Sequence, residues 1–274
     1  MKTTTLRLGT TDSTNRYLRD YAANRPTGGD TETAVVAVAD YQTSGHGQGD
    51  NSWESEAGKN LLFSILTYPT SVRPRQQFVL SMAMALAVAD ALGHYTDGIR
   101  LKWPNDVYRH DSKISGTLIE TRIVAGTLAH CISGTGINVN QRTFRSDAPN
   151  PVSLYNIIGR ETPIEEMLHR VLDAYGRYYD MVLRGEYDAI SDKYHAALYR
   201  RNEEHLYEDG TGRFTATLTG VDEQGRLLLQ RDNGLRAYSF KEVRFVIAAD
   251  TARSCVGAER ARLESAPTGR ALPA

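Results

Sequence analysis

The sequence has almost no cysteine, no excess of charge of either sign, and no apolar run that approaches the length of a membrane span. Its 32 basic and 33 acidic residues leave a formal net charge of −1, so nothing global favours nucleic acid or an anionic membrane as a partner. The two cysteines, Cys131 and Cys255, lack the spacing of a metal site or a disulfide framework. Met1 to Thr11 is short and polar, without a signal-peptide core. We therefore expect a cytoplasmic protein that binds neither nucleic acid nor membrane.

The apolar periodicity of the first 200 residues predicts an α+β fold. With 41% hydrophobic and 24% charged residues, the composition is that of an ordinary soluble protein, and 274 residues suffice for a large domain with a small companion. Asp12 to Asn15 offers capping side chains ahead of a helix that carries Leu18 on one face. Further helices are expected at 78–92, 165–183 and 189–199, and strands at 34–39, 61–66, 99–103, 106–108, 113–122 and 127–139.

The composition changes near Leu206, after which short alternating strands are expected at 214–219, 227–230 and 237–240. Asp222–Gly225 and Asp232–Gly234 have the residues of the turns between them. Roughly 45 residues of this kind predict a small β-barrel. We therefore expect a domain at 1–205, a β-domain at 206–250, and a flexible tail at 251–274 that is rich in Ala, Arg, Ser, Gly and Pro.

A polar, glycine-rich segment runs from Gly45 to Trp53. Closely spaced glycines allow backbone N–H groups to converge on an anion, and Trp53 offers a flat stacking surface. The segment matches neither the Walker A spacing nor the dinucleotide-binding fingerprint. On composition alone it is equally compatible with a flexible surface loop.

The segment Leu101–Asp106 places a cation, an amide and a carboxylate within five residues around Pro104, which interrupts a strand pattern. Lys102 could hold nucleotide phosphates and Asp106 could hold Mg²⁺. The alternative is the end of a twisted hairpin whose charges are solvated.

Two further segments carry glycine inside strand patterns, Lys113–Glu120 and Ser133–Asn140. A lysine at the start of a strand is usually only solvated, but Gly116 inside the strand indicates close approach by a ligand or by backbone. Joining a carboxylate to ATP brings two anions together, and an ammonium such as that of Lys113 would offset their repulsion. Gly134 and Gly136 permit a second close contact of the same kind.

Read together over about residues 1–200, these segments resemble the catalytic domain of biotin–protein ligases. The family's D-S-T-N start is matched at Asp12 to Asn15, and its glutamine and glycine-rich loop are matched by Gln42 and by Gly45 to Asp50. Three more motifs follow in family order: K-W-P-N-D at 102–106, K-x-x-G at 113–116 and G-x-G-x-N at 134–138. The resemblance implies a mixed β-sheet core like those of class II aminoacyl-tRNA synthetases and lipoate ligases, followed by a small C-terminal SH3-like barrel.

The resemblance also implies which residues form the site. Lys113 and Lys102 would be catalytic, and Asp106 would lie near a Mg²⁺ ion that accompanies ATP. The adenylate would be held by Trp53, Lys102, Asn105, Asp106 and Asn138. Biotin would be bound by Ser13, Thr14, Asn15, Gln42, Gly45, His46, Gly47, Gln48, Lys113, Gly116 and Gly134.

The implied reaction is the ATP-dependent activation of biotin to biotinyl-5′-AMP, followed by transfer of biotin to a lysine of a biotin carboxyl carrier domain. Too few residues precede Ser13 for a helix-turn-helix, so we expect the ligase-only form, as a monomer or homodimer. The alternatives are a lipoate or octanoate ligase and a non-catalytic biotin-binding protein.

The glycine-rich loop departs from the family pattern at three positions. His46 and Gln48 stand where the family carries arginine, and Asp50 replaces a glycine. Loss of two fixed cations and gain of an anion weaken the electrostatic hold on an adenylate. We therefore expect looser retention of biotinyl-AMP than in an arginine-bearing relative.

Overall fold

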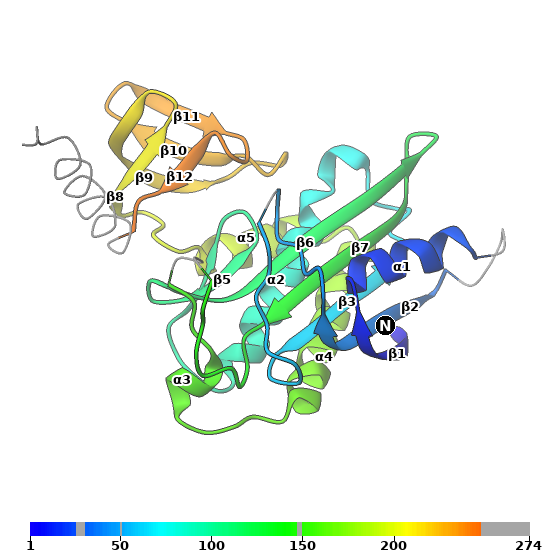
Figure 1. Cartoon of the computed structure of the whole chain (residues 1–274). Coiled ribbons are helices and arrows are strands. Elements are labelled where there is room, and N and C mark those ends of the chain that lie inside the picture. The colour runs from blue at the N-terminus through cyan, green and yellow to red at the C-terminus, as the bar shows by residue number, and fades with distance from the viewer. Residues whose placement is uncertain (26–30, 50, 147–149, 248–274) are drawn as a thin grey trace, which may run out of the picture.

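The computed structural model describes residues 1–25, 31–49, 51–146 and 150–247. They form a large mixed β-sheet with helices on both faces and a smaller antiparallel sheet at the C-terminal end (Figure 1). Asp50, Cys255 and the predicted flexible tail at 251–274 lie outside the described residues.

The large sheet has seven strands in the order β1-β2-β3-β7-β6-β5-β4. Only β1 and β2 run parallel, and every other neighbouring pair is antiparallel, which confirms the predicted mixed sheet. The strands are β1 (Lys2–Thr11), β2 (Thr33–Gln42), β3 (Leu61–Thr67), β4 (Ile99–Lys102), β5 (Asp106–Arg109), β6 (Ser112–Val124) and β7 (Thr127–Ile137). The helices are α1 (Thr14–Ala23), η1 (Pro74–Gln76), α2 (Phe78–Gly93), α3 (Leu154–Ile158), α4 (Ile164–Leu183) and α5 (Tyr187–Ala197).

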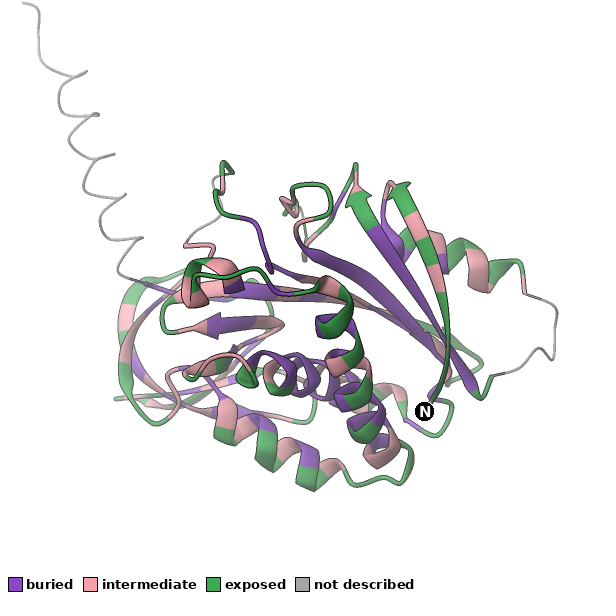
Figure 2. Ribbon diagram, turned by 90° about the horizontal axis from the view of Figure 1, so that it is seen from below, coloured by how far each residue is buried: buried purple, intermediate pink, exposed green. Residues whose placement is uncertain are grey.

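Strand β2 contributes to an apolar core on each face of the large sheet. Its seven consecutive buried residues, Thr33–Ala39, alternate between the faces because successive side chains of a strand point in opposite directions. Val36 and Val38 belong to the larger core with α2 and α4, whereas Val35 and Ala37 pack with Leu18 of α1. Figure 2 shows the central strands of the large sheet buried along most of their length. One face thus carries the helical layer, and the other is only partly covered by α1.

Helix α2 is the most apolar helix of the described chain. Together with η1 it forms a 20-residue segment, Pro74–Gly93, whose most apolar 18-residue window has a mean hydropathy of 1.3, so that by length and composition alone it could cross a membrane. The expectation that no apolar run approaches that length is therefore wrong. Within the fold, however, 61% of the segment's most apolar window is buried, and α2 packs on α4, α5 and the sheet. Its apolar character is explained by contacts on several sides.

The C-terminal sheet has five antiparallel strands in the order β11-β10-β9-β8-β12. Strands β9, β10 and β11 were expected from the alternation of apolar and polar residues, whereas β8 and β12 were not. In this order β11 and β12 are edge strands that do not pair with each other, so closure into an SH3-like barrel stays a prediction. The strands are β8 (Glu204–Asp209), β9 (Gly212–Val221), β10 (Leu227–Arg231), β11 (Gly234–Tyr238) and β12 (Val243–Phe245).

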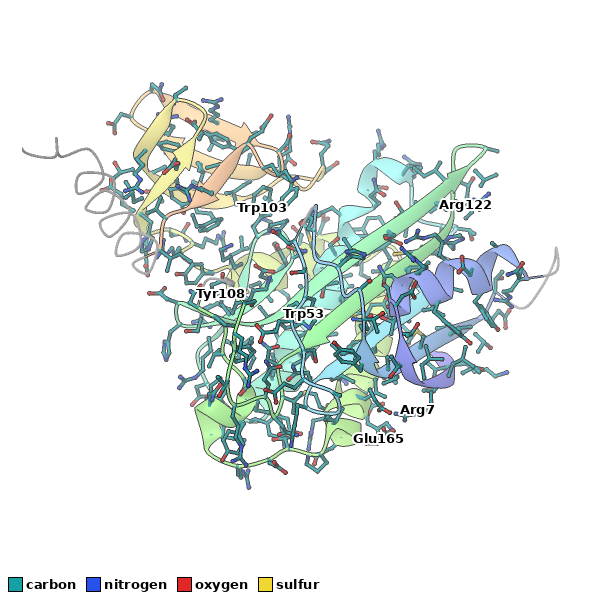
Figure 3. All side chains as sticks on the ribbon, in the orientation of Figure 1. Arg7, Trp53, Trp103, Tyr108, Arg122 and Glu165 are labelled. Carbon is teal, nitrogen blue, oxygen red and sulfur yellow. The ribbon has the colours of Figure 1, made fainter. Side chains whose placement is uncertain are left out.

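The turn between β9 and β10 docks on the large domain at Trp103. The indole Nε1–H of this buried residue donates to the Gly225 carbonyl over 2.8 Å. Gly225 has φ +80°, and a Cβ atom there would lie 2.6 Å from the Phe78 ring, so the turn requires glycine for both conformation and space. Figure 3 shows Trp103 on the side of the large domain that faces the C-terminal sheet.

We expect Trp103→Phe to lower the free energy of unfolding by about 1 kcal/mol, because the Gly225 carbonyl loses its donor while most of the ring packing remains. Chemical denaturation followed by circular dichroism measures the change. An unfolding midpoint equal to that of the unsubstituted protein would show that this hydrogen bond does not stabilise the docking.

Candidate active site

Strand register brings residues that are far apart in the sequence onto the partly covered face of the large sheet. In one cross-strand row, Lys102 lies opposite Asp106, Asp106 opposite Gly116, and Gly116 opposite Gly136. The adjacent row joins Leu118, Gly134 and Ser64. Because residues directly opposite in a sheet share a face, the K-W-P-N-D, K-x-x-G and G-x-G-x-N motifs converge on one surface.

Glycine at positions 134 and 136 makes room for side chains that lie flat on this surface. A Cβ atom at Gly134 would lie 2.0 Å from Asn15 Oδ1, and one at Gly136 would lie 2.4 Å from the Trp53 ring. Gly116 is less crowded, with Lys113 and Trp53 atoms 3.2 Å from its Cβ position. Figure 3 shows Trp53 over the middle of the large sheet. The space beside Gly134 and Gly136 is therefore occupied by the side chains of Asn15 and Trp53, and the predicted close approach of a ligand to these glycines stays a prediction.

Gly116, Gly134 and Gly136 form the glycine floor of the site. The start of α1 forms a neutral, hydrogen-bonded recess beside this floor. Ser13 caps the helix by accepting from the Arg16 N–H, as its sequence position predicts. Gln42 Oε1 accepts from the Thr14 N–H over 2.7 Å and from the Thr14 hydroxyl over 3.1 Å. Asn15 donates through Nδ2 to the Leu118 carbonyl over 3.4 Å. These side chains are fixed in orientation before any ligand is bound.

Ser64 completes the recess and was not identified from the sequence. Its fully buried hydroxyl lies 2.6 Å from Asn15 Oδ1 and 2.7 Å from Thr14 Oγ1. The available signal was a hydroxyl in the middle of the apolar run Leu61–Leu66 of strand β3, because a buried polar side chain requires a partner.

Two ammonium groups flank one carboxylate at the other end of the row. Lys113 Nζ lies 2.6 Å from Asp106 Oδ1, and Lys102 Nζ lies 4.0 Å from Asp106 Oδ2. Their side chains are 13–29% exposed, so the cluster is shielded from solvent but remains accessible. Lys102 also lies over the Phe245 ring, with Nζ 4.8 Å from the centroid, so β12 borders the cluster. The cluster has an excess of positive charge and suits an anionic ligand.

The glycine-rich segment is a short hairpin. His46 and Ser52 form an antiparallel bridge, Gly47 N–H donates to the Asn51 carbonyl over 2.7 Å, and Trp53 N–H donates to the Gly45 carbonyl over 2.9 Å. Trp53 Nε1–H and Gln48 Oε1 are buried and have no hydrogen-bond partner among the described residues, which do not include the neighbouring Asp50. A buried polar group without a partner is costly, so both atoms are candidates for contact with a ligand.

Asn105 and Asn138 hold backbone in place. Asn105 Nδ2 donates to the Thr117 carbonyl, and Asn138 Nδ2 donates to the Val152 carbonyl over 3.1 Å. Both line the cavity, but their amide nitrogens are already engaged. Their predicted contact with an adenylate stays a prediction.

One continuous cavity of about 790 Å³ is surrounded by the recess, the glycine floor, the hairpin and the charged cluster. All predicted site residues line it except Gly45, which lines an adjoining cavity of about 400 Å³ behind the hairpin. Sequence reasoning missed several other residues of the larger cavity wall, namely Glu54, Tyr108, Phe144, Ser146, Pro151 and Phe240.

Comparison with known proteins gives matches at both ends of the chain. Residues 9–138 match the biotin/lipoate A/B protein ligase family, and residues 207–245 match the biotin protein ligase C-terminal domain. The bifunctional ligase/repressor BirA of Escherichia coli is 28% identical over 238 residues, which are 85% of this chain and 71% of that protein. The biotin–[acetyl-CoA-carboxylase] ligase of Paracoccus denitrificans is 27% identical over 245 residues, covering 87% of this chain and 99% of that protein.

Among solved structures, the biotin protein ligase of Aquifex aeolicus in complex with biotin and ATP superposes with a TM-score of 0.72. It is 29% identical, and the match covers 88% of this chain and 99% of that one. The two family models, the relatives along most of the chain and the shared fold agree with the five motifs on the cavity wall. The chain belongs to the biotin protein ligase family.

Proposed function

We propose that this cavity activates biotin with ATP and that the protein then transfers the biotin to a lysine of a biotin carboxyl carrier domain. The observation that carries the proposal is the arrangement of one cavity with a neutral hydrogen-bonding recess at one end and the Lys102–Asp106–Lys113 cluster at the other. Biotin has the same polarity, with a neutral ureido ring at one end and a carboxylate at the other.

In the first step, a biotin carboxylate oxygen attacks the α-phosphorus of ATP, and the bond to the β-phosphate oxygen breaks to release pyrophosphate. Lys113 would lie between the two reacting anions and offset their repulsion, while Asp106 holds its ammonium in place at 2.6 Å. Lys102 would bind a phosphate oxygen. In the second step, the carrier lysine amine attacks the acyl carbon, AMP leaves, and the amine proton is lost to solvent.

The glycine floor and the hairpin would keep water from the mixed anhydride between the two steps. Trp53 lies against Gly136, and within the described part of the chain neither its Nε1–H nor Gln48 Oε1 has a hydrogen-bond partner, so both atoms are available to the intermediate. Exclusion of water prevents hydrolysis of a reactive acyl phosphate and strengthens the remaining polar contacts.

The predicted role of Asp106 as a Mg²⁺ ligand fits this arrangement poorly. Its carboxylate is already flanked by two ammonium groups, and no group of three or more His, Cys, Asp or Glu side chains that could hold a metal occurs in the described ranges. Mg²⁺ is commonly bound through substrate phosphates with few protein ligands. Mg²⁺ would therefore arrive as part of the Mg·ATP substrate, and Asp106 would position the Lys113 ammonium.

The proposal is tested by incubating the protein with ATP, a carrier domain and either biotin, lipoate or octanoate, and detecting the acylated carrier by its increase in mass. An ATP-dependent signal with biotin that is absent with lipoate and octanoate is expected. A signal with lipoate or octanoate would support the lipoate-ligase alternative, and biotin binding without transfer would support the non-catalytic alternative.

The hairpin gives a prediction about the intermediate. We expect His46→Arg/Gln48→Arg to release biotinyl-AMP about tenfold more slowly, because charge-assisted hydrogen bonds to the phosphate replace neutral ones. Release is measured by rapid dilution of the enzyme–intermediate complex. Thr3→Arg, on the exposed part of β1, is the control for added positive charge. Equal release from the double variant and the unsubstituted protein contradicts the prediction.

A further inference from the structure

Glu54 joins the end of the hairpin to the segment that follows β7. Its carboxylate accepts from the backbone N–H groups of Arg145 and Ser146, each over 2.8 Å, and from Gln141 Nε2 over 3.3 Å. Three donors on one side chain are more than a solvated surface carboxylate requires. Glu54 and Ser146 both line the cavity, so this junction is part of its wall.

The junction is anchored by a buried network. Gln141 is fully buried, and its Oε1 accepts from Asn60 Nδ2 over 2.6 Å and from the Glu56 N–H over 3.1 Å. Asn60 Oδ1 in turn accepts from the Val139 N–H over 3.0 Å. The segment 54–60 is thereby fixed to the segment 138–146 at both ends, and a fully satisfied polar network of this kind holds one backbone arrangement.

Two cavity-lining aromatic side chains lie next to this junction in sequence. Trp53, over the glycine floor, immediately precedes Glu54, and Phe144 immediately precedes Arg145. Phe144 lines the same cavity as Lys113 and Asp106 of the charged cluster.

We propose that Glu54 is a positioning residue for the nucleotide: it links the hairpin that covers biotin to the segment that carries Phe144, so that the wall against which ATP binds is already formed. This inference rests on the proposed function. Burial of Glu54 opposes its ionisation, but the hydrogen bonds from Ser146 and Arg145 outweigh burial and lower the pKa of the carboxyl, so the negative form is present at neutral pH.

The direction in which nucleotide affinity changes when the Glu54 carboxylate is removed distinguishes a positioning role from a purely electrostatic one. A carboxylate that only stands near a polyphosphate repels it, so its removal would strengthen nucleotide binding. If Glu54 holds the wall, its removal weakens binding despite the lost repulsion. We expect Glu54→Ala to weaken binding of a non-hydrolysable ATP analogue about 10- to 100-fold by calorimetry, with biotin affinity changed less than twofold when no nucleotide is present.

Glu56→Gln is the matched control, because this exposed residue lies two positions away and contributes only backbone atoms to the network. Glu54→Gln keeps one acceptor oxygen and should fall between the unsubstituted protein and Glu54→Ala. Equal or tighter analogue binding by Glu54→Ala, or an equal loss in Glu56→Gln, would overturn the proposal.

A second readout does not depend on biotin chemistry. Arg142 and Arg145 are exposed trypsin sites on the segment that Glu54 holds. We expect cleavage there to be about tenfold faster in Glu54→Ala than in Glu56→Gln, because local opening limits cleavage of a held segment. Unchanged cleavage would overturn the positioning role. If the unsubstituted protein bound neither biotin nor the analogue, the proposed function would fail while this comparison still tested Glu54.

Discussion

Replacing Lys113 by alanine is expected to slow biotin-dependent pyrophosphate release about a thousandfold. Removal of one group that stabilises charge in a transition state commonly costs two to three powers of ten in rate. Lys113 is the ammonium closest to Asp106, at 2.6 Å, whereas Lys102 lies 4.0 Å from the same carboxylate and beside the Phe245 ring. Without Lys113, Asp106 would add a nearby negative charge to two anions that must react.

The measurement separates the two half-reactions. Pyrophosphate release reports activation, and transfer from chemically prepared biotinyl-AMP reports the second step. We expect the loss in Lys113→Ala to be larger in activation, because only that step joins two anions. Lys59→Ala is the control, since Lys59 is 45% exposed and forms a 3.7 Å ion pair with Glu161 away from the cavity wall. Activation within tenfold of the unsubstituted rate would remove Lys113 from the proposed role.

Most helices and strands of the large domain could be predicted from the sequence because they have strong local signals. Helix α2 was predicted from an Ala- and Leu-rich run bounded by proline and glycine, and β2 and β3 from continuous apolar runs. Strand β8 was missed because Glu204–Asp209 is mostly polar and only Tyr207 is buried. Such a strand is specified by its pairing with β9.

The site was predictable where it consists of motifs and unpredictable where it depends on register. The order of the five motifs pointed to one family, but no local pattern places Ser64 beside Asn15, because that contact arises from the packing of α1 on β3. The same is true of Phe240, which reaches the cavity from the C-terminal sheet. Glu54 was missed for a different reason, since its partners are backbone N–H groups that any sequence supplies.

The packing of Asn15 on Gly134 gives the second large expected effect. Gly134→Ala should raise the KM for biotin about a hundredfold, because the added methyl group would lie 2.0 Å from Asn15 Oδ1 and must displace a side chain that Ser64 holds at 2.6 Å. Loss of about two hydrogen bonds accounts for a change of that size. No backbone strain contributes, since Gly134 lies inside the paired strand β7 and lacks a positive φ.

Two further glycines calibrate this effect, and a double substitution tests its cause. Gly116→Ala, with its nearest neighbours at 3.2 Å, should raise the KM for biotin no more than about tenfold, and Gly9→Ala, with nothing within 4 Å, should leave it unchanged. If the methyl group acts by displacing Asn15, then Gly134→Ala should cost nothing further once Asn15→Ala has removed that side chain, because effects of residues in contact are not additive. Additive losses in steady-state kinetics would instead mean that Gly134 itself contacts the substrate, and the recess around Asn15 would then have to be reassigned from biotin binding to support of the strand.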